Sequence, residues 1–206
     1  MKRKGSVTLI STSCSIAAIG IRLLSSFLKN SKYHVKIIFL PISPDNDAVY
    51  SDNVISDIVD ICKNDHLIGI SLMTNDYLKT KDLTQKLKKH INIPVLWGGI
   101  HPTVKPEDCL NDVDLVCVGE GEEALLELLN KLVSKQSISD IQNIWYKDKV
   151  TGRIYRNSVR PLEENLDKYP DQDYSCEDHF ILDENRVIPL TIQLLEKFMP
   201  GYGGIR

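Results

Sequence analysis

Residues 6–133 alternate short apolar runs with amphipathic stretches, and this alternation restricts the possible fold more than any other feature of the chain. The runs Ser6–Ser11, His34–Leu40 and Leu67–Leu72 have the length and composition of strands. Between them, Ile16–Leu28 and Leu78–His90 carry apolar residues at helical spacing. Because such alternation is typical of parallel sheets, the sequence predicts an α/β fold with a doubly wound, five-stranded parallel sheet. The remaining strands are expected at Pro94–Trp97 and Val113–Val118, and the remaining helices at Val54–Cys62 and Glu122–Val133.

Glycine-rich segments follow the fourth and fifth predicted strands. LWGGIHPT covers residues 96–103, and VCVGEGEEALLELL covers residues 116–129. Right-handed crossovers bring the carboxyl ends of parallel strands to one edge, where open α/β sheets bind their ligands. Glycine permits a close backbone approach, although glycine pairs also mark plain turns. Together the two segments predict one ligand-binding edge.

Polar residues at this edge have alternative interpretations. The hydroxyl groups in residues 11–15 either bind a ligand or cap the following helix. His101 is either a ligand contact or a structural loop histidine. Glu122 complements the dipole of its helix, while the backbone N–H groups of Gly119–Gly121 can face an anion or an amide. The residues alone leave these alternatives open.

Composition excludes several classes of function. A net charge of −3 argues against a nucleic-acid partner, which a basic protein would normally bind. The five cysteines are scattered, with no pair at C-x2-C spacing, so we expect no metal site built from them. Free thiols suit a reducing cytosol, and no segment is long and apolar enough to cross a membrane. We therefore expect a cytoplasmic protein without a membrane partner.

The pattern changes after Lys135. The runs IQNIWYK (residues 141–147) and RIYRNS (residues 153–158) predict a β-hairpin that turns at Gly152. Residues 160–175 contain two prolines and little periodicity, which predicts an extended linker. A short helix is expected at Leu190–Phe198, and a flexible end at residues 199–204. We therefore divide the chain into an α/β domain, residues 1–136, and a hairpin plus linker, residues 137–206.

The order of three motifs resembles a known family. IGISLMT (residues 68–74) is followed by LWGGIHPT and then by DLVCVGEGEEALLELL (residues 114–129). This order resembles the cobalamin-binding domain found at the N-terminus of many radical S-adenosylmethionine enzymes. The Gly-x-Ser and Gly-Gly strand ends are general to cobalamin domains, and the GGxHPT and GEGE elements are typical of the radical-enzyme branch. The hairpin and the segment that follows it resemble the connector of that family.

The resemblance implies a Rossmann-like, flavodoxin-like cobalamin-binding fold with cobalamin across the strand ends. The dimethylbenzimidazole tail would lie between the sheet and a helix. Because no histidine follows the first strand, the resemblance implies base-off cobalamin with no protein metal ligand, suited to methyl transfer. We expect Gly99→Trp to abolish binding. The implied contacts are Ser11, Thr12 and Ser13 in the first loop; Ser71, Met73 and Thr74 at the third strand end; Gly98, Gly99, His101 and Thr103 at the fourth; and Gly119, Glu120 and Gly121 at the fifth.

One family element is missing from the chain. The catalytic half of the family holds a 4Fe-4S cluster with a C-x3-C-x2-C motif, and no such motif occurs here. The chain alone is therefore expected to have no catalytic residues. The 4Fe-4S cluster and S-adenosylmethionine would belong to a catalytic domain of methyltransferase or cyclase type, in cis or in trans.

Two other functions stay open. The first is a degenerate domain that serves as a docking module, with its crevice filled by large side chains such as Leu72, Met73, Trp97 and Ile100. The second is an independent small-molecule enzyme, which the residues favour least because no acid–base pair stands at the strand ends.

Overall fold

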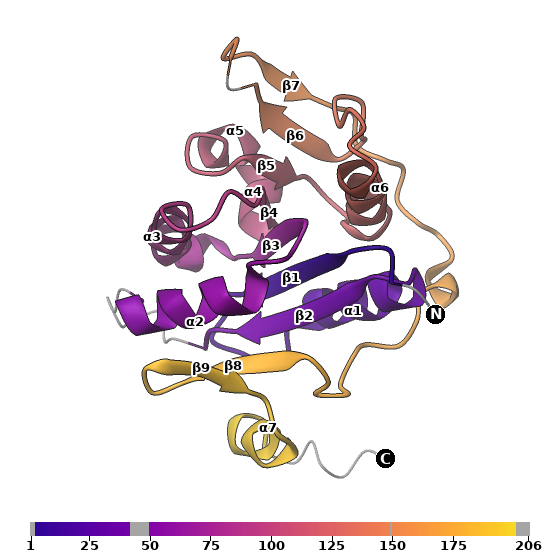
Figure 1. Cartoon of the computed structure of the whole chain (residues 1–206). Helices are drawn as coiled ribbons and strands as arrows, with labels where there is room; N and C mark the ends of the chain where they lie inside the picture. Colours follow the sequence, from indigo (N-terminus) through magenta and orange to yellow (C-terminus); the bar gives the residue numbers. More distant parts are fainter. Residues whose placement is uncertain (1–2, 42–49, 149, 201–206) are drawn as a thin grey trace.

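The computed structural model describes residues 3–41, 50–148 and 150–200. Its strands form one nine-stranded sheet in the order β7-β6-β5-β4-β3-β1-β2-β8-β9, with helices on both faces (Figure 1). The five central strands are parallel, which confirms the predicted fold class. These strands are β1 (Ser6–Ser11), β2 (His34–Phe39), β3 (Leu67–Ser71), β4 (Val95–Gly98) and β5 (Leu115–Cys117).

Helices cover the two faces of the sheet as a doubly wound topology requires. The helices α1 (Ile19–Asn30) and α6 (Glu122–Val133) pack on one face. The opposite face is covered by α2 (Asp52–Cys62) and α3 (Tyr77–Leu87). Short elements follow β3 and β4 at the strand ends: η1 (Thr74–Asp76), α4 (Ile100–Val104) and α5 (Pro106–Cys109).

The predicted hairpin is confirmed, and it extends the sheet. Its strands β6 (Ile144–Lys147) and β7 (Ile154–Arg156) are antiparallel, and β6 pairs with β5. The rings of Tyr146 and Tyr155 stack across the pair with their centroids 4.6 Å apart. Gly152 has a φ of 70°, a conformation that favours glycine.

The prediction for the C-terminal region was incomplete. Residues 160–175, expected as an extended linker, contain a short 3-10 helix, η2 (Leu166–Lys168), and then pack against α1. Two unpredicted strands follow, β8 (His179–Asp183) and β9 (Arg186–Pro189). Because β8 pairs in parallel with β2 and β6 pairs with β5, each hairpin adds two strands, and the sheet has nine strands rather than five.

The short helix near the C-terminus is confirmed as α7 (Ile192–Phe198), and the Thr191 side chain caps it by accepting from the N–H of Leu194. Residues 201–204 of the expected flexible end lie outside the described residues. The domain boundary at residue 136 stays a prediction.

Candidate functional site

The carboxyl ends of β3, β4 and β5 lie side by side, as the sequence predicted. Ser71 at the end of β3 is in register with Gly98 at the end of β4. Beneath these ends, between the sheet and the helices α1 and α6, lies a cavity of about 220 Å³. Its lining comprises Leu9, Gly20, Ile21, Leu24, Gly69, Ile70, Ser71, Leu96, Gly98, Gly99, Cys117, Gly119, Glu120, Gly121, Glu122 and Leu125.

Missing side chains keep this cavity open. Six of the lining residues are glycines. A Cβ atom at Gly98 would meet nothing closer than the Cβ of Cys117, at 3.8 Å. A Cβ atom at Gly20 would meet no atom within 4 Å. A Cβ atom at either position would therefore fit without displacing its neighbours.

Gly99 has a different reason to be glycine. Its φ is 97°, and a Cβ atom there would lie 2.9 Å from the carbonyl oxygen of Leu72. The backbone after β4 thus passes too close to the backbone after β3 for any side chain to fit. Because Gly99→Trp would disturb the backbone as well as a ligand, substitution of Gly98 is the cleaner test of the cavity.

Thr103 connects the two glycine-rich segments that follow β4 and β5. Its hydroxyl donates to the carbonyl oxygen of Gly99 at 2.8 Å and accepts from the N–H of Gly119 at 3.1 Å. Gly119 has a φ of 82°, and the carbonyl of neighbouring Val118 accepts from the Asn143 side chain at 2.7 Å. Thr103 therefore fixes the spacing of these two segments and does not line the cavity.

The first loop contributes structural contacts. Ser11 and Thr12 are buried, and the Thr12 hydroxyl lies 3.3 Å from the carbonyl oxygen of Ser71, to which it donates. Ser13 stabilises a local turn by accepting from the N–H of Ser15. The alternative that these hydroxyls cap α1 is wrong, because the N-cap of that helix is Ala18 and no side chain caps it.

His101 lies on α4, outside the cavity lining. Its side chain is buried, with a tilted ring contact to Tyr77 at 4.8 Å. Its Nδ1 lies 3.3 Å from the hydroxyl of Thr74, whereas Nε2 is buried without a partner. Met73, also predicted, is exposed at the same edge. Of the thirteen predicted contacts, the cavity lining brings together Ser71, Gly98, Gly99, Gly119, Glu120 and Gly121.

Sequence reasoning overlooked two polar groups in the cavity. Burial raises the pKa of the Glu122 carboxyl, which the sequence had assigned only to the helix dipole. Burial likewise raises the pKa of the Cys117 thiol to about 12, so this cysteine stays protonated. The alternation of β5 between the two faces was a usable signal, because it places Cys117 on the same face as Leu115.

The arrangement suits binding better than catalysis. The walls are apolar apart from Ser71, Glu120, Glu122, the Cys117 thiol and backbone groups. Across the described ranges, no three His, Cys, Asp or Glu side chains gather as a metal site. None of the described helices is long and apolar enough to cross a membrane.

Comparison with known proteins gives a consistent family match. The model of the B12 binding domain matches residues 5–129. A curated relative from Pyrococcus horikoshii, named "Uncharacterized methyltransferase PH0819", is 29% identical over 163 residues, which cover 76% of this chain and 33% of the relative. The chain thus spans about a third of that relative's length.

Solved structures of similar fold have long chains as well. The cobalamin-dependent S-adenosylmethionine radical enzyme OxsB, with aqua-cobalamin and S-adenosylmethionine bound, matches with a TM-score of 0.66 and 18% identity over 94% of this chain and 31% of that one. The radical S-adenosylmethionine methyltransferase TsrM from Kitasatospora setae, with cobalamin and a [4Fe-4S] cluster bound, matches with a TM-score of 0.63 and 16% identity over 84% and 32%. At these identities the likeness shows the fold.

Proposed function

The chain belongs to the B12-binding domain family, and we propose that it binds cobalamin with the nucleotide tail in the cavity under β3, β4 and β5. The observation that carries this proposal is the glycine-lined cavity at the strand ends. A Cβ atom at Gly20 would meet no atom within 4 Å, and one at Gly98 would meet only the Cβ of Cys117, at 3.8 Å. At both positions a Cβ atom would fit without a clash, yet both are glycine.

The size of the cavity indicates that it holds only part of a ligand. Pockets that enclose a whole drug-sized ligand measure about 300–1,000 Å³. The cavity measures about 220 Å³ and is largely apolar, which suits one aromatic arm of a larger molecule. The rest of the ligand would lie across the exposed edge that Met73 and Ile100 border, both of which are about half exposed.

The polar groups of the cavity suit the ends of such an arm. The Ser71 hydroxyl and the Glu122 carboxyl stand in an apolar wall and can bond ring nitrogen or ribose groups. The backbone N–H of Gly119 is already engaged, because it donates to the Thr103 hydroxyl at 3.1 Å. We further propose that the ligand is bordered, outside the cavity, by His101, Met73, Thr74 and the first-loop residues Ser11, Thr12 and Ser13.

We propose base-off binding without a protein imidazole. No histidine lines the cavity within the part of the chain that the structure describes, and residues 12–18 of the first loop contain none. Cobalamin held in this way would have no cobalt ligand from the protein, which would suit the carrying of a methyl group.

We also propose a catalytic partner. The radical-enzyme relatives are much longer than this chain, and one of them is named a methyltransferase. The five cysteines of the chain include no C-x3-C-x2-C motif. A 4Fe-4S cluster and S-adenosylmethionine would therefore be bound by a radical S-adenosylmethionine domain, in cis or in trans, in the cytoplasm.

The docking-module alternative has less support. It requires large side chains in the crevice, but Trp97 and Leu72 are buried in the core on the opposite face. Neither of them lines the cavity.

An absorbance titration with hydroxocobalamin tests the proposal. We expect a saturable spectral change with one equivalent bound. Absence of any change at ligand concentrations far above the protein concentration would contradict cobalamin binding. Electron paramagnetic resonance of the bound Co(II) form tests the base-off state, because splitting by a coordinated nitrogen would contradict it.

A further inference from the structure

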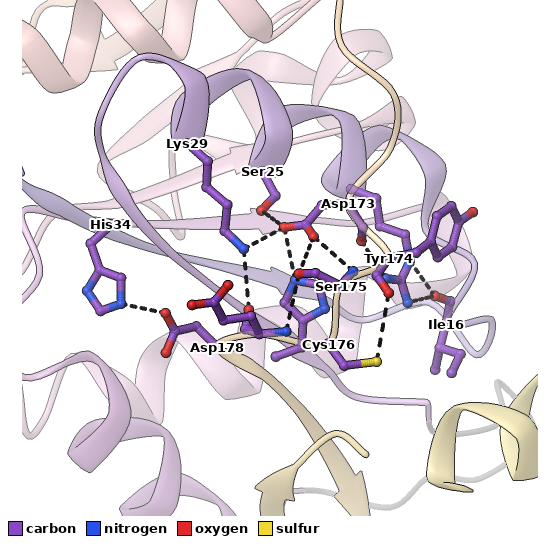
Figure 2. A network of polar contacts seen from close by, with 12 residues as sticks. Ile16, Ser25, Lys29, His34, Asp173, Tyr174, Ser175, Cys176 and Asp178 are labelled. Carbon is purple, nitrogen blue, oxygen red and sulfur yellow. Dashed lines mark hydrogen bonds and ion pairs between the residues drawn. The ribbon is translucent and has the colours of Figure 1, made fainter. Parts of the chain in front are cut away.

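The segment Asp173–Asp178, called the strap here, crosses α1 on its way to β8 (Figure 2). It lies outside residues 5–129, which the family model matches. Backbone hydrogen bonds fix both of its ends. The N–H of Asp173 donates to the carbonyl oxygen of Arg22 at 3.1 Å, and the carbonyl oxygen of Asp178 accepts from Ile37 at 3.0 Å.

The Asp173 carboxylate is the centre of a buried network. One oxygen lies 2.6 Å from the Ser25 hydroxyl, 2.7 Å from the Lys29 ammonium and 3.1 Å from Nε2 of His179. The other oxygen accepts from the Ser175 hydroxyl at 2.7 Å. Burial raises the pKa of Asp173, but these hydrogen bonds outweigh burial and hold that pKa well below its usual range. Asp173 is therefore charged and well partnered.

Arg22 joins the strap to the loop before α1. Its guanidinium is buried and lies between the rings of Phe39 and Tyr174, at 4.5 and 4.4 Å. It donates to the carbonyl oxygens of Asp173 at 2.8 Å, Ile16 at 2.9 Å and Ala17 at 3.0 Å. A planar guanidinium is suited to such a fork of acceptors. Arg22, Ser25, Lys29, Asp173 and His179 are called the clasp below.

The opposite side of the same helix forms a wall of the cavity. Gly20, Ile21 and Leu24 line the cavity, whereas Arg22 and Ser25 face the strap. The start of this helix has little support of its own. Its N-cap, Ala18, has a φ of 37° and no side-chain cap. A left-handed conformation of a residue with a side chain persists only where its surroundings hold it.

We propose that the clasp is a positioning device for the ligand site: the strap, acting through Arg22 and Asp173, holds α1 where its Gly20 face forms the cavity wall. This inference rests on the proposed function. Arg22 and Asp173 touch no ligand in this account, and they act by keeping the wall in its binding position before a ligand arrives. A ligand that binds only the ordered form loses apparent affinity in proportion to the population of that form.

Asp173→Asn tests the clasp, and Asp57→Asn is the matched control. Asp57 on α2 also anchors the C-terminal region: it accepts from the Arg186 guanidinium at 2.7 and 2.8 Å and from the Val187 N–H at 2.9 Å. It does not line the cavity. Loss of either carboxylate loosens the packing of the β8–β9 hairpin, but only loss of Asp173 loosens α1.

The two measurements are hydrogen exchange of the ligand-free protein and an absorbance titration with hydroxocobalamin. For Asp173→Asn we expect loss of most of the exchange protection over residues 16–24 and about tenfold weaker binding, as a fall of the ordered form to about a tenth would give. For Asp57→Asn we expect both values to stay within about twofold of the wild type. Equal effects of the two substitutions on residues 16–24, or on affinity, would overturn the inference.

The outcomes separate this inference from the proposed function. If the wild type binds no hydroxocobalamin, the proposed function fails and so does the role of the clasp in binding. Exchange over residues 16–24 then reports only on the helix. If Asp173→Asn does not fold, Ser25→Ala replaces it, because that variant removes a single hydrogen bond from the network. We expect the same two changes at smaller size, and no change in either would overturn the inference.

Discussion

The two faces of the central sheet differ at the carboxyl ends of the strands: one is filled by side chains and the other has a cavity. On β4, Trp97 points to the face covered by α2 and α3, where it is fully buried, while its neighbour Gly98 leaves the other face empty. Ser71 at the end of β3 lines the cavity, and Leu72, directly after the strand, is buried on the opposite face. At the carboxyl ends of these strands one face is therefore filled with side chains, whereas the other face, which α1 and α6 pack elsewhere, has a cavity. The alternation of side chains along a strand allows one short segment to do both.

The largest expected effect is on the packed face. Trp97 is fully buried, and its Nε1–H donates to the Thr84 hydroxyl at 3.0 Å. We expect Trp97→Ala to lower the free energy of unfolding by about 3–5 kcal/mol, as truncation of buried aromatic residues does. Urea denaturation followed by circular dichroism measures this loss. A loss below about 1 kcal/mol would contradict the assignment of this face to packing.

Gly98, the residue after Trp97, tests the face that has the cavity. We expect Gly98→Leu to weaken hydroxocobalamin binding by about 100-fold, or about 2.7 kcal/mol, because the new side chain fills space the ligand needs. The free energy of unfolding should change far less than in Trp97→Ala, since a Cβ atom at Gly98 meets nothing closer than 3.8 Å. A spectral titration together with denaturation separates the two effects. Unchanged affinity in a folded variant would contradict the location of the site.

A smaller effect is expected at the mouth of the cavity. Gly20 lies in α1, where replacement of glycine by a good helix former stabilises by about 0.8 kcal/mol. Gly20→Leu should therefore raise the free energy of unfolding while weakening cobalamin binding by about tenfold. Ser26→Leu on the same helix is the control, because Ser26 does not line the cavity. Parallel losses of affinity in both variants would count against a specific role of Gly20.

The smallest expected effect is that of a fall in pH on α1, the helix that lines the cavity. Burial lowers the pKa of His179, which faces Asp173, Lys29 and Arg22, and the bond to Asp173 offsets this only in part. At a pH below about 6.5 the unfolded chain binds a proton at His179 that the folded chain does not, so stability falls as pH falls. The low pKa of Asp173 leaves its contribution constant over this range.

Protection factors from hydrogen exchange at about pH 7.5 and about pH 5 measure this effect. We expect α1 to lose protection on acidification while α3 keeps it, and His179→Gln to reduce the difference. Equal loss in both helices, or an unchanged pH dependence in the variant, would argue against His179 as the group responsible.

The sequence predicted one side of the molecule better than the other. The central strands were predictable because short apolar runs such as Leu67–Leu72 alternate with amphipathic stretches, and the Gly98-Gly99 segment marked the binding edge. The sites of His101 and Thr12 were less predictable. Both follow strand ends, yet local helical and buried loop geometry turns them away from the cavity lining.

The C-terminal region was hidden for a different reason. The strand β8 pairs with β2, and the strap packs on α1, so both depend on contacts between residues far apart in the chain. Prolines and acids before Asp173 indicate a linker, while the partners that bury its carboxylate, Ser25 and Lys29, lie on α1. Local patterns contain no information on such pairing.

The most direct test of the cavity compares cobalamin with cobinamide, which lacks the nucleotide tail, in the wild type and in Gly98→Leu. If the tail occupies the glycine-lined space, the wild type should prefer cobalamin by about 100-fold, and the variant should bind both with similar, weak affinity. Equal affinity of the wild type for the two corrinoids, or a preference that survives in the variant, would contradict the account.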